Sequence, residues 1–469
     1  MSKNLNKIAA IAIPAIMAVA VAQPAEAKIL VIGDGGWEVS FDGSVNGFYT
    51  MTSKEELPGA VAGTATTGGG TYRGGLTLSG NGNGDDDSRV QSGLLPTFFG
   101  VNINAPTTNG LDMGVRFSID PTIANGHAKN GRVDIDLREN FFTVGGSFGT
   151  VQVGRSLSHF GAGAIVSDMT LFGVGAPSSG NGTGLGRIGY GYQYANFNAN
   201  IRYTTPDLNG FKISGGIYDP STVLAEATGY NAAETESPRF EGAANYAGDF
   251  NGVSVSAWVD GMIQEAQFAN AAATRLGTVS AANAAALVNG GTTATAAANN
   301  GTGVTGWGFG GGAVLGYAGF TFTGYGYTGE GMGLGLSYNT FGANSGKAAT
   351  DVLGNERDGN GWYAQGTYAF GQGTSVGVSY GLSSQDETSV DKLIRNNTTA
   401  ATANSGNIYT EEQSMIDAMI WHDINKNLRI VGEYSHMEAE FFDGADQDAD
   451  AVSIGGFFFW QIGRASCRE

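Results

Sequence analysis

The sequence predicts an all-β protein, a transmembrane antiparallel β-barrel of sixteen strands. Three observations carry this prediction: a glycine-rich composition with few charges, an apolar and polar alternation of period two, and short turns that alternate with long loops. The 469 residues include 77 Gly, 25 Phe and 18 Tyr, and only 14% are charged. Soluble domains carry about 25% charged residues and about 7% Gly. After residue 27, no apolar run approaches the roughly 20 residues of a spanning helix, whereas a closed barrel crosses a membrane with alternating strands.

The alternation is clear in the segment 111–119. Its apolar face comprises Leu111, Met113, Val115, Phe117 and Ile119, and its polar face includes Asp112, Arg116 and Ser118. The segments 375–382 and 428–434 follow the same pattern. Because successive strand side chains point to opposite faces of a sheet, these segments fit a wall with one lipid-facing side and one polar side.

Short turns alternate with long loops along the chain. The predicted turns are 206–210, 248–252, 318–319, 371–373 and 424–427, and the predicted loops are 53–88, 219–237, 264–305, 328–360 and 384–412. Outer-membrane barrels have short periplasmic turns and longer extracellular loops, flanked by aromatic girdles. The aromatic residues beside the turns are therefore expected to form a girdle, and they are Phe211, Tyr246, Tyr317, Phe320 and Phe370.

An even number of strands follows from these segments. The predicted strands are 37–52, 89–104, 111–120, 133–145, 149–155, 187–204, 211–218, 238–247, 253–262, 306–317, 320–327, 361–370, 374–383, 413–423, 428–437 and 451–462. Sixteen strands allow antiparallel closure with both chain termini on the short-turn side. A soluble sandwich or propeller is the alternative, but it needs no apolar outward face on every strand.

The N-terminal segment predicts a cleaved secretory signal. Lys3 and Lys7 precede an apolar stretch over 8–21, and residues 25–27 have the A-x-A pattern of a cleavage site. These three features are those of a signal peptide over residues 1–27.

The C-terminal segment 463–469 interrupts the aromatic pattern of the last strand. It contains Cys467, the only cysteine, and it resembles a non-native read-through tail. Ile462 stands where the alternation predicts a terminal aromatic residue. We therefore expect the barrel to comprise residues 28–462, without disulfide or thiol chemistry.

The formal net charge of −19 argues against nucleic acid as a partner, because the phosphate backbone requires a basic surface. The scattered histidines and carboxylates form no recognisable catalytic set. His159 with Ser156 or Ser158 is the nearest pairing, and it does not favour an enzyme. We expect no cofactor and no metal. A last-loop cluster of Asp443, Asp446, Asp448 and Asp450 could bind divalent ions, but it lacks the spacing of a calcium loop and favours a solvated acidic loop.

Several stretches resemble the Gram-negative general porin family. Residues 138–155 contain the R-x-x-aromatic strand, the G-x-F-G-T turn and the V-G-R strand end of that family, and residues 203–211 are similar to its Y-x-S-P-x-F-x-G turn. Residues 168–175 resemble the family's third loop, and residues 37–43 its first strand. The resemblance extends over the whole barrel as a pattern, but only 138–175 and 203–211 are motif-specific.

This resemblance implies a homotrimer in the outer membrane, in contact with lipid and lipopolysaccharide. It also implies a third loop that folds into the lumen, and passive diffusion of small hydrophilic solutes and ions without bond-making chemistry.

The resemblance also implies a constriction in which third-loop acids oppose arginines of the barrel wall. Asp168 is the loop candidate, and the wall candidates are Arg116, Arg138 and Arg155, with Arg89 higher up. Alternation supports Arg116 independently, since it shares a face with Asp112 and Ser118. Asp42 and Asn46 of the first strand are weaker candidates. The simpler interpretation is that these side chains are ordinary lumen residues in contact with water, without a role in a constriction.

Two alternatives stay open. A substrate-selective channel for sugars or dicarboxylates would need an aromatic track, to which Tyr325, Tyr327 and Tyr363 could contribute. A structural or adhesive barrel could have its mouth capped by the loop 264–305. For ions we expect a moderate cation preference, because lumen-facing acids outnumber the arginines; these acids are Asp42, Asp112, Asp134, Asp136, Glu241 and Glu433.

Overall fold

The computed structural model describes residues 31–32, 35–59, 71–76, 86–123, 135–177, 183–226, 232–268, 303–338, 346–351, 354–396 and 407–462. The expected signal peptide, the cleavage site and the tail 463–469 lie outside the described residues. So does Asp134, together with most of the loop 264–305.

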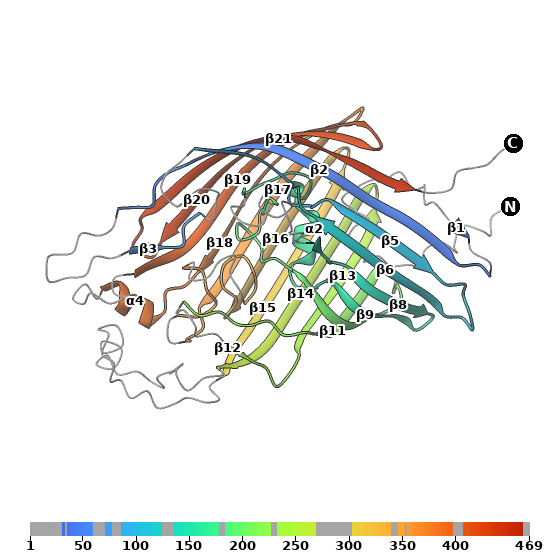
Figure 1. Ribbon diagram of the computed structural model, residues 1–469, viewed down its shortest axis with the longest axis horizontal. Coiled ribbons are helices and arrows are strands. Elements are labelled where there is room, and N and C mark those ends of the chain that lie inside the picture. The colour runs from blue at the N-terminus through green and yellow to red at the C-terminus, as the bar shows by residue number, and fades with distance from the viewer. Residues whose placement is uncertain are drawn as a thin grey trace.

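Sixteen antiparallel strand positions close into a barrel, as predicted (Figure 1). The barrel strands are β2 (Glu38–Lys54), β4 (Asp87–Gln91) with β5 (Phe98–Asn104), β6 (Asp112–Pro121), β8 (Asn140–Gly146), β9 (Gly149–Leu157), β10 (Phe197–Thr204), β11 (Phe211–Tyr218), β13 (Arg239–Phe250), β14 (Val253–Phe268), β15 (Gly303–Tyr317), β16 (Phe320–Glu330), β17 (Asp358–Gly371), β18 (Thr374–Gln385), β19 (Asn407–Asn425), β20 (Leu428–Phe441) and β21 (Asp446–Ile462). The last strand, β21, pairs with β2 and closes the sheet. The first strand begins and the last strand ends on the short-turn side, because Phe41 is opposite Ile462 and Glu38 is opposite Asn104.

The short turns have the sequence chemistry that tight hairpins require. Asn251 and Gly252 connect β13 to β14 with φ angles of 54° and 85°. Asn and Gly tolerate such positive φ angles, which match the twist of the flanking strands. The carboxylate of Asp249 accepts a hydrogen bond from the Gly252 N–H at 3.0 Å, so the turn is fixed by its own side chain.

The outer face of the barrel is apolar. Phe309, Phe322 and Ile454 are 55%, 57% and 65% exposed. The aromatic residues beside the turns are also exposed or half-buried, and Phe211 lies against Tyr246 with a ring separation of 4.5 Å. This arrangement confirms the predicted outward faces and the aromatic girdle.

Within the described residues, no helix combines the length and the hydropathy that a membrane-crossing helix needs.

Three predicted strands differ from the structure. The predicted strand 187–204 is ordered as β10 only from Phe197, because 187–196 belongs to the loop before it. The predicted strand 133–145 contains the short β7 (Ile135–Asp136) and then β8. The predicted strand 89–104 is interrupted at 92–97, where the backbone bonds to the third loop instead of to a strand.

The third loop, residues 158–196, folds into the barrel (Figure 1). We call it loop 3. It contains the helix α2 (Ala162–Ser167) and the 3₁₀ helix η2 (Met169–Phe172). Phe160, Ala164 and Met169 are buried against inward-facing wall residues. The core of this barrel is therefore the contact between loop 3 and one side of the wall, and the predicted inward loop is confirmed for the described residues.

The acidic residues predicted in the last loop mostly lie on a strand. Asp446, Asp448 and Asp450 belong to β21, because β20 and β21 continue beyond the predicted ends. Carboxylate oxygens of Glu438, Asp446 and Asp448 lie within 4.8 Å of one another, at the long-loop end. The pairing of β20 with β21 places Glu438 directly opposite Asp448.

Candidate functional site

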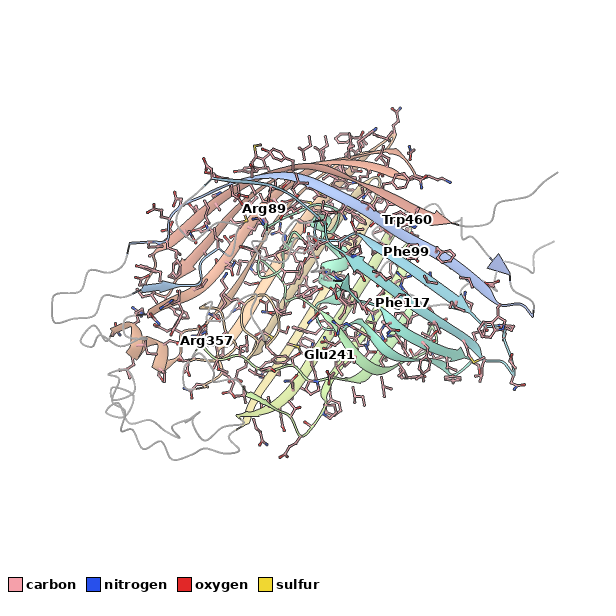
Figure 2. All side chains as sticks on the ribbon, in the orientation of Figure 1. Arg89, Phe99, Phe117, Glu241, Arg357 and Trp460 are labelled. Atoms are coloured by element: carbon pink, nitrogen blue, oxygen red, sulfur yellow. The ribbon has the colours of Figure 1, made fainter. Side chains whose placement is uncertain are left out.

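Two buried glutamates of the wall hold loop 3 by its backbone. Glu241 on β13 accepts hydrogen bonds from the N–H groups of His159 and Phe160, at 2.7 and 3.0 Å. Glu433 on β20 accepts them from Val174 (2.6 Å) and Gly175 (3.0 Å). Each carboxyl group thus satisfies two consecutive backbone N–H groups in a buried place, where an unpaired N–H group would be costly. The two carboxylates therefore fix loop 3 on both sides of its helical segment (Glu241 is labelled in Figure 2).

The middle of loop 3 is held by neutral side chains of β17. Gln365 accepts from the N–H of Met169 at 2.7 Å and donates to the carbonyl of Ser167 at 3.2 Å. The hydroxyl of Tyr363 donates to the carbonyl of Ala164 at 2.9 Å. Because these bonds involve backbone groups, they set the path of the loop whatever side chains it presents to the lumen.

Inward-facing glycines leave the space into which loop 3 packs. A Cβ atom at Gly308 would lie 2.7 Å from the ring of Phe160. At Gly93, in the interrupted strand, a Cβ atom would overlap the carbonyl oxygen of Gly173. That oxygen also accepts the N–H of Leu94 at 2.9 Å. The wall therefore reaches the loop backbone directly at this point.

Asp168 is turned into loop 3. Its carboxylate accepts hydrogen bonds from the Thr170 N–H at 3.0 Å and from the Tyr192 hydroxyl at 2.9 Å, and only 3% of the residue is exposed. It caps η2. Among the described residues, no hydrogen bond or ion pair joins Asp168 to Arg116, Arg138 or Arg155, and its partners Thr170 and Tyr192 belong to loop 3.

Arg116 lies on the inner face, as alternation predicts, but it is enclosed by acids. Its Nη1 lies 3.0 Å from Asp42 Oδ1, and its Nε is bonded to the carboxylate of Glu139. Asn102 accepts a further bond from Nη1 at 3.0 Å. The side chains of Arg116, Asp42 and Glu139 are 12%, 25% and 28% exposed, so solvent reaches all three.

The other candidate arginines occupy different positions. Arg155 pairs in register with Asn140 and Ala199, whose strands place the exposed Phe142 and Ile201 on the same face. The structure therefore contradicts a pore-lining position for Arg155 and places it on the outer face.

Arg138 lies just before β8, 2.9 Å from Asp136 and with its guanidinium 5.5 Å from the centre of the Phe197 ring. Phe197 is the first residue of β10, and the Arg138 N–H donates to the Asp120 carboxylate at 3.3 Å, so Arg138 lies beside β6, next to Glu139. Arg89 is on β4, opposite the buried Thr50, and its Nε lies 3.2 Å from Asp87 (Figure 2). Asn46 is buried and donates to the carbonyl of Leu95 at 2.8 Å.

Other inward-facing cations were not among the predicted residues. Arg202 donates to Gln152 Oε1 at 2.9 Å, and Arg187 of loop 3 donates to the carbonyl of Met415 at 2.8 Å. Alternation with Asn198 and Asn200 could have identified Arg202. No sequence pattern indicates Arg187, because its position depends on the fold of loop 3.

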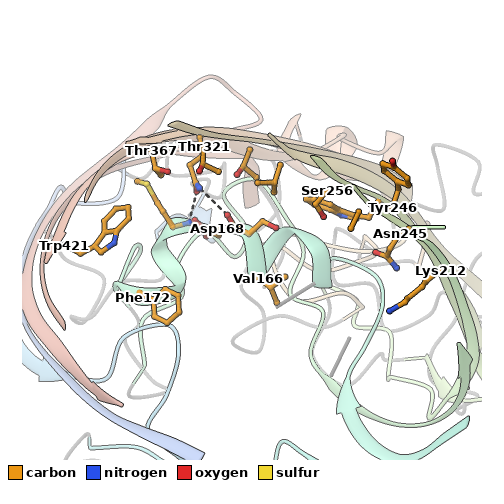
Figure 3. A pocket seen from close by; sticks show the side chains of 18 of the residues that line it. Val166, Asp168, Phe172, Lys212, Asn245, Tyr246, Ser256, Thr321, Thr367 and Trp421 are labelled. Atoms are coloured by element: carbon orange, nitrogen blue, oxygen red, sulfur yellow. Dashed lines mark hydrogen bonds between the residues drawn. The ribbon is translucent and has the colours of Figure 1, made fainter. Parts of the chain in front are cut away.

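A cavity opens below loop 3, towards the short turns (Figure 3). Lys212 and Trp421 lie at opposite ends of the view, with Asp168 between them. Arg429 also lines this cavity; its guanidinium is 4.9 Å from the centre of the Phe172 ring, and its Nε is 2.7 Å from Asp423. Hydroxyl and amide side chains line much of the remaining wall, and they are Asn245, Ser256, Thr321, Thr323, Gln365 and Thr367. The geometry is that of a water-accessible passage narrowed by a fixed loop.

The three inward tyrosines do not form an open track. Tyr325, Tyr327 and Tyr363 are at most 5% exposed, because loop 3 covers them. Phe160 lies edge-on to Tyr327, with ring centres 6.3 Å apart. This burial removes the aromatic contribution that a sugar-selective pore would need at these positions.

The comparison of this sequence with protein families decides its identity: residues 10–388 match the family described as Gram-negative porin. The chain belongs to the Gram-negative porin family. This porin is therefore located in the outer membrane, where it forms a channel for passive diffusion.

Solved structures share its fold at low sequence identity. The outer membrane channel DcaP of Acinetobacter baumannii is 14% identical, with a TM-score of 0.59, and the match covers 92% of this chain and all of that one. The anion-selective porin from Comamonas acidovorans is 14% identical, with a TM-score of 0.51, and the match covers 90% of this chain and all of that one. No curated protein sequence matches the porin.

Proposed function

We propose that this porin passes small hydrophilic solutes and ions as a homotrimer, with a moderate preference for cations. The observation that carries the ion preference is the position of Arg116 between Asp42 and Glu139. The guanidinium is paired on both sides, so this part of the wall carries two carboxylates for one arginine. Asp120, four residues after Arg116 on β6, adds a third, and it accepts the N–H of Arg138 at 3.3 Å.

The arginines of the expected positive ring have different surroundings. Arg155 faces outward, and Arg138 is paired with Asp136 and bonded to Asp120. Charges on the wall of a narrow passage act over short distances and are less screened than loop charges, so the local excess of acids outweighs the more distant charges. Cations are therefore concentrated at this wall, and anions are partly excluded.

Membership of a family of channels argues against a role as an enzyme. The homotrimer rests on the family resemblance, and chemical cross-linking of the purified porin tests it directly. A cross-linked species of three chains supports the proposal, and a monomer at every cross-linker concentration contradicts it.

The ion preference is tested by reversal potentials in a potassium chloride gradient. We expect a cation-selective sign for the unmodified porin and a stronger cation preference for Arg116→Ala, which leaves Asp42 and Glu139 unpaired. Asp42→Asn with Glu139→Gln should weaken the preference or reverse it, because Arg116 then keeps its full charge. The changes should be larger at 0.1 M than at 1 M salt, since the Debye length falls from about 10 Å to about 3 Å.

Asp450→Asn is the matched control, because it removes an exposed carboxylate at the long-loop end of β21, next to β2. Its reversal potential should equal that of the unmodified porin. An anion-selective sign that becomes cation-selective only in Arg116→Ala would show instead that the arginine dominates this wall.

A further inference from the structure

Three extracellular loops meet at one buried arginine. Arg357 ends the loop between β16 and β17, residues 331–357, which we call loop 6. Its guanidinium forms two parallel bonds of 2.8 Å with Asp391 and a third bond of 2.9 Å with Glu226. Glu226 belongs to the loop between β11 and β13 (loop 4), and Asp391 to the helix α4 (Ser389–Asn396) of the loop between β18 and β19 (loop 7).

All three side chains are at most 1% exposed. Figure 2 shows Arg357 at the end of the barrel away from the two termini. Paired charges at this burial are strongly coupled, and removing one partner leaves the others uncompensated.

The surrounding contacts extend this arrangement into one layer. The carboxylate of Glu226 accepts the N–H of Ala348 at 2.8 Å, so loop 4 holds the backbone of loop 6. The Arg357 Nη1 donates to the carbonyl of Ala348 at 3.1 Å. Lys347 is buried beside Glu226, and this burial lowers its pKa to about 7, although the carboxylate acts in the opposite direction. Of these two buried basic residues, Arg357 therefore provides the permanent positive charge that holds the three loops together.

Asp391 is itself held in place by the start of α4. Its N–H donates to the Thr388 hydroxyl at 3.0 Å, and its carboxylate accepts the Thr388 N–H at 3.2 Å. This reciprocal pair is a capping box, which satisfies the first N–H groups of a helix. Loop 7 therefore presents a preorganised carboxylate to the arginine.

Loop 6 also descends into the lumen and bonds to loop 3. The carbonyl of Gly335 accepts the N–H of Tyr194 at 2.6 Å, and the carbonyl of Gly333 accepts the side chain of Gln193, also at 2.6 Å. Leu336 and Tyr194 form a parallel β-bridge. The hydroxyl of Tyr338 donates to the carbonyl of Gly306 on β15 at 2.9 Å. Loop 6 thus connects the buried arginine to the loop that narrows the pore.

We propose that Arg357 is a positioning residue for the pore: by locking loops 4, 6 and 7 together it keeps loop 6 in the lumen against loop 3. The lock and the constriction are connected through the backbone bonds at Gly333 and Gly335. Without the bidentate fork, loop 6 withdraws, the outer part of the passage widens and loop 3 loses its extracellular support. This proposal rests on the channel function and is independent of the proposed cation preference.

The test measures single-channel conductance of the full-length porin in planar bilayers. Arg357→Gln should raise the conductance of each channel and increase current noise, because loop 6 no longer occupies the lumen. Arg357→Lys should act in the same direction, since an ammonium group cannot form the two parallel bonds of the guanidinium. Arg395→Gln is the control: it removes a different arginine, on α4, that is partly exposed and paired with Glu387, outside the lock, and its conductance should stay near that of the unmodified porin.

A disulfide distinguishes positioning from a general loss of structure. Tyr194→Cys with Leu336→Cys, in a Cys467→Ser background, joins loop 3 to loop 6 at their β-bridge. In combination with Arg357→Gln, oxidation should return the conductance to that of the oxidised double-cysteine porin, and reduction should raise it again. An Arg357→Gln porin with unchanged conductance overturns the proposal, as does an increase that the disulfide does not reverse.

Cross-link formation in isolated outer membranes gives a second readout if Arg357→Gln assembles poorly. The same cysteine pair should oxidise more slowly when Asp391→Asn weakens the lock than when Asp391 is intact. Equal oxidation rates would show that the arginine does not hold loop 6 against loop 3.

Discussion

Replacing Glu433 with alanine is expected to release one end of loop 3 and to make the channel close at lower voltage. The carboxylate accepts the N–H groups of Val174 and Gly175, and both groups are buried against the wall. Leaving a buried donor without an acceptor costs about 1–3 kcal/mol. Loop 3 would then sample positions further into the lumen, which increases current noise and the probability of closure under an applied voltage.

The graded variant Glu433→Gln removes one of the two acceptor oxygens and keeps the other. A glutamine keeps one acceptor oxygen, so one of the two N–H groups stays bonded and the closing voltage should lie between those of the unmodified porin and the alanine variant. Glu440→Ala is the matched control, because it removes an exposed carboxylate from the same strand, away from loop 3. A closing curve for Glu433→Ala that coincides with that of Glu440→Ala would show that this anchor does not hold the loop.

The two glutamate anchors show how far the sequence alone reaches. Their strand alternation places Glu241 and Glu433 on the inner face, and the structure confirms this position for both. Their partners could not be predicted, since the N–H groups that they hold lie 82 and 259 residues away in the chain. Period-two alternation determines which face a side chain occupies, but a loop that folds across the lumen has no such period.

The candidate arginines likewise differ in how well the sequence predicts their positions. Arg116 was assigned from its own strand alternation, and it lies on the inner face. Arg155 was assigned from a resemblance to a family motif, although Val151 and Val153 share its position in the alternation. The structure follows the alternation: Gln152 and Ser156 are buried inside, and Arg155 is exposed on the other face. For this barrel, strand alternation within the chain is the better guide to pore-lining residues than a short motif.

The broken second strand also has a local cause. A continuous strand over 89–104 would satisfy the alternation, but the segment 92–97 bonds to loop 3 through Leu94 and Leu95. The carbonyl of Ser92 likewise accepts the N–H of Gly184 in loop 3. The missing side chain of Gly93 permits this approach. The sequence does not indicate this role, because residues 92–97 and loop 3 come together only in the folded barrel.

Gly93→Ala is therefore expected to have a large effect for a single added methyl group. The new Cβ atom would overlap the carbonyl oxygen of Gly173, whereas carbon and oxygen in close contact are separated by roughly 3.3 Å or more. That oxygen is bonded to the N–H of Leu94, so it cannot move without breaking this bond. Overpacking of a tightly packed contact costs about 1–3 kcal/mol.

Gly324→Ala is the matched control, because the same methyl group there would meet no atom within 4 Å. We expect Gly93→Ala to shift single-channel conductance and to lower the temperature at which the folded porin unfolds in detergent, while Gly324→Ala changes neither. Gly93→Ala combined with Glu433→Ala should show less than the sum of the two single effects on the closing voltage, since both act on residues 173–175. Fully additive effects would mean that the interrupted strand and Glu433 hold loop 3 independently.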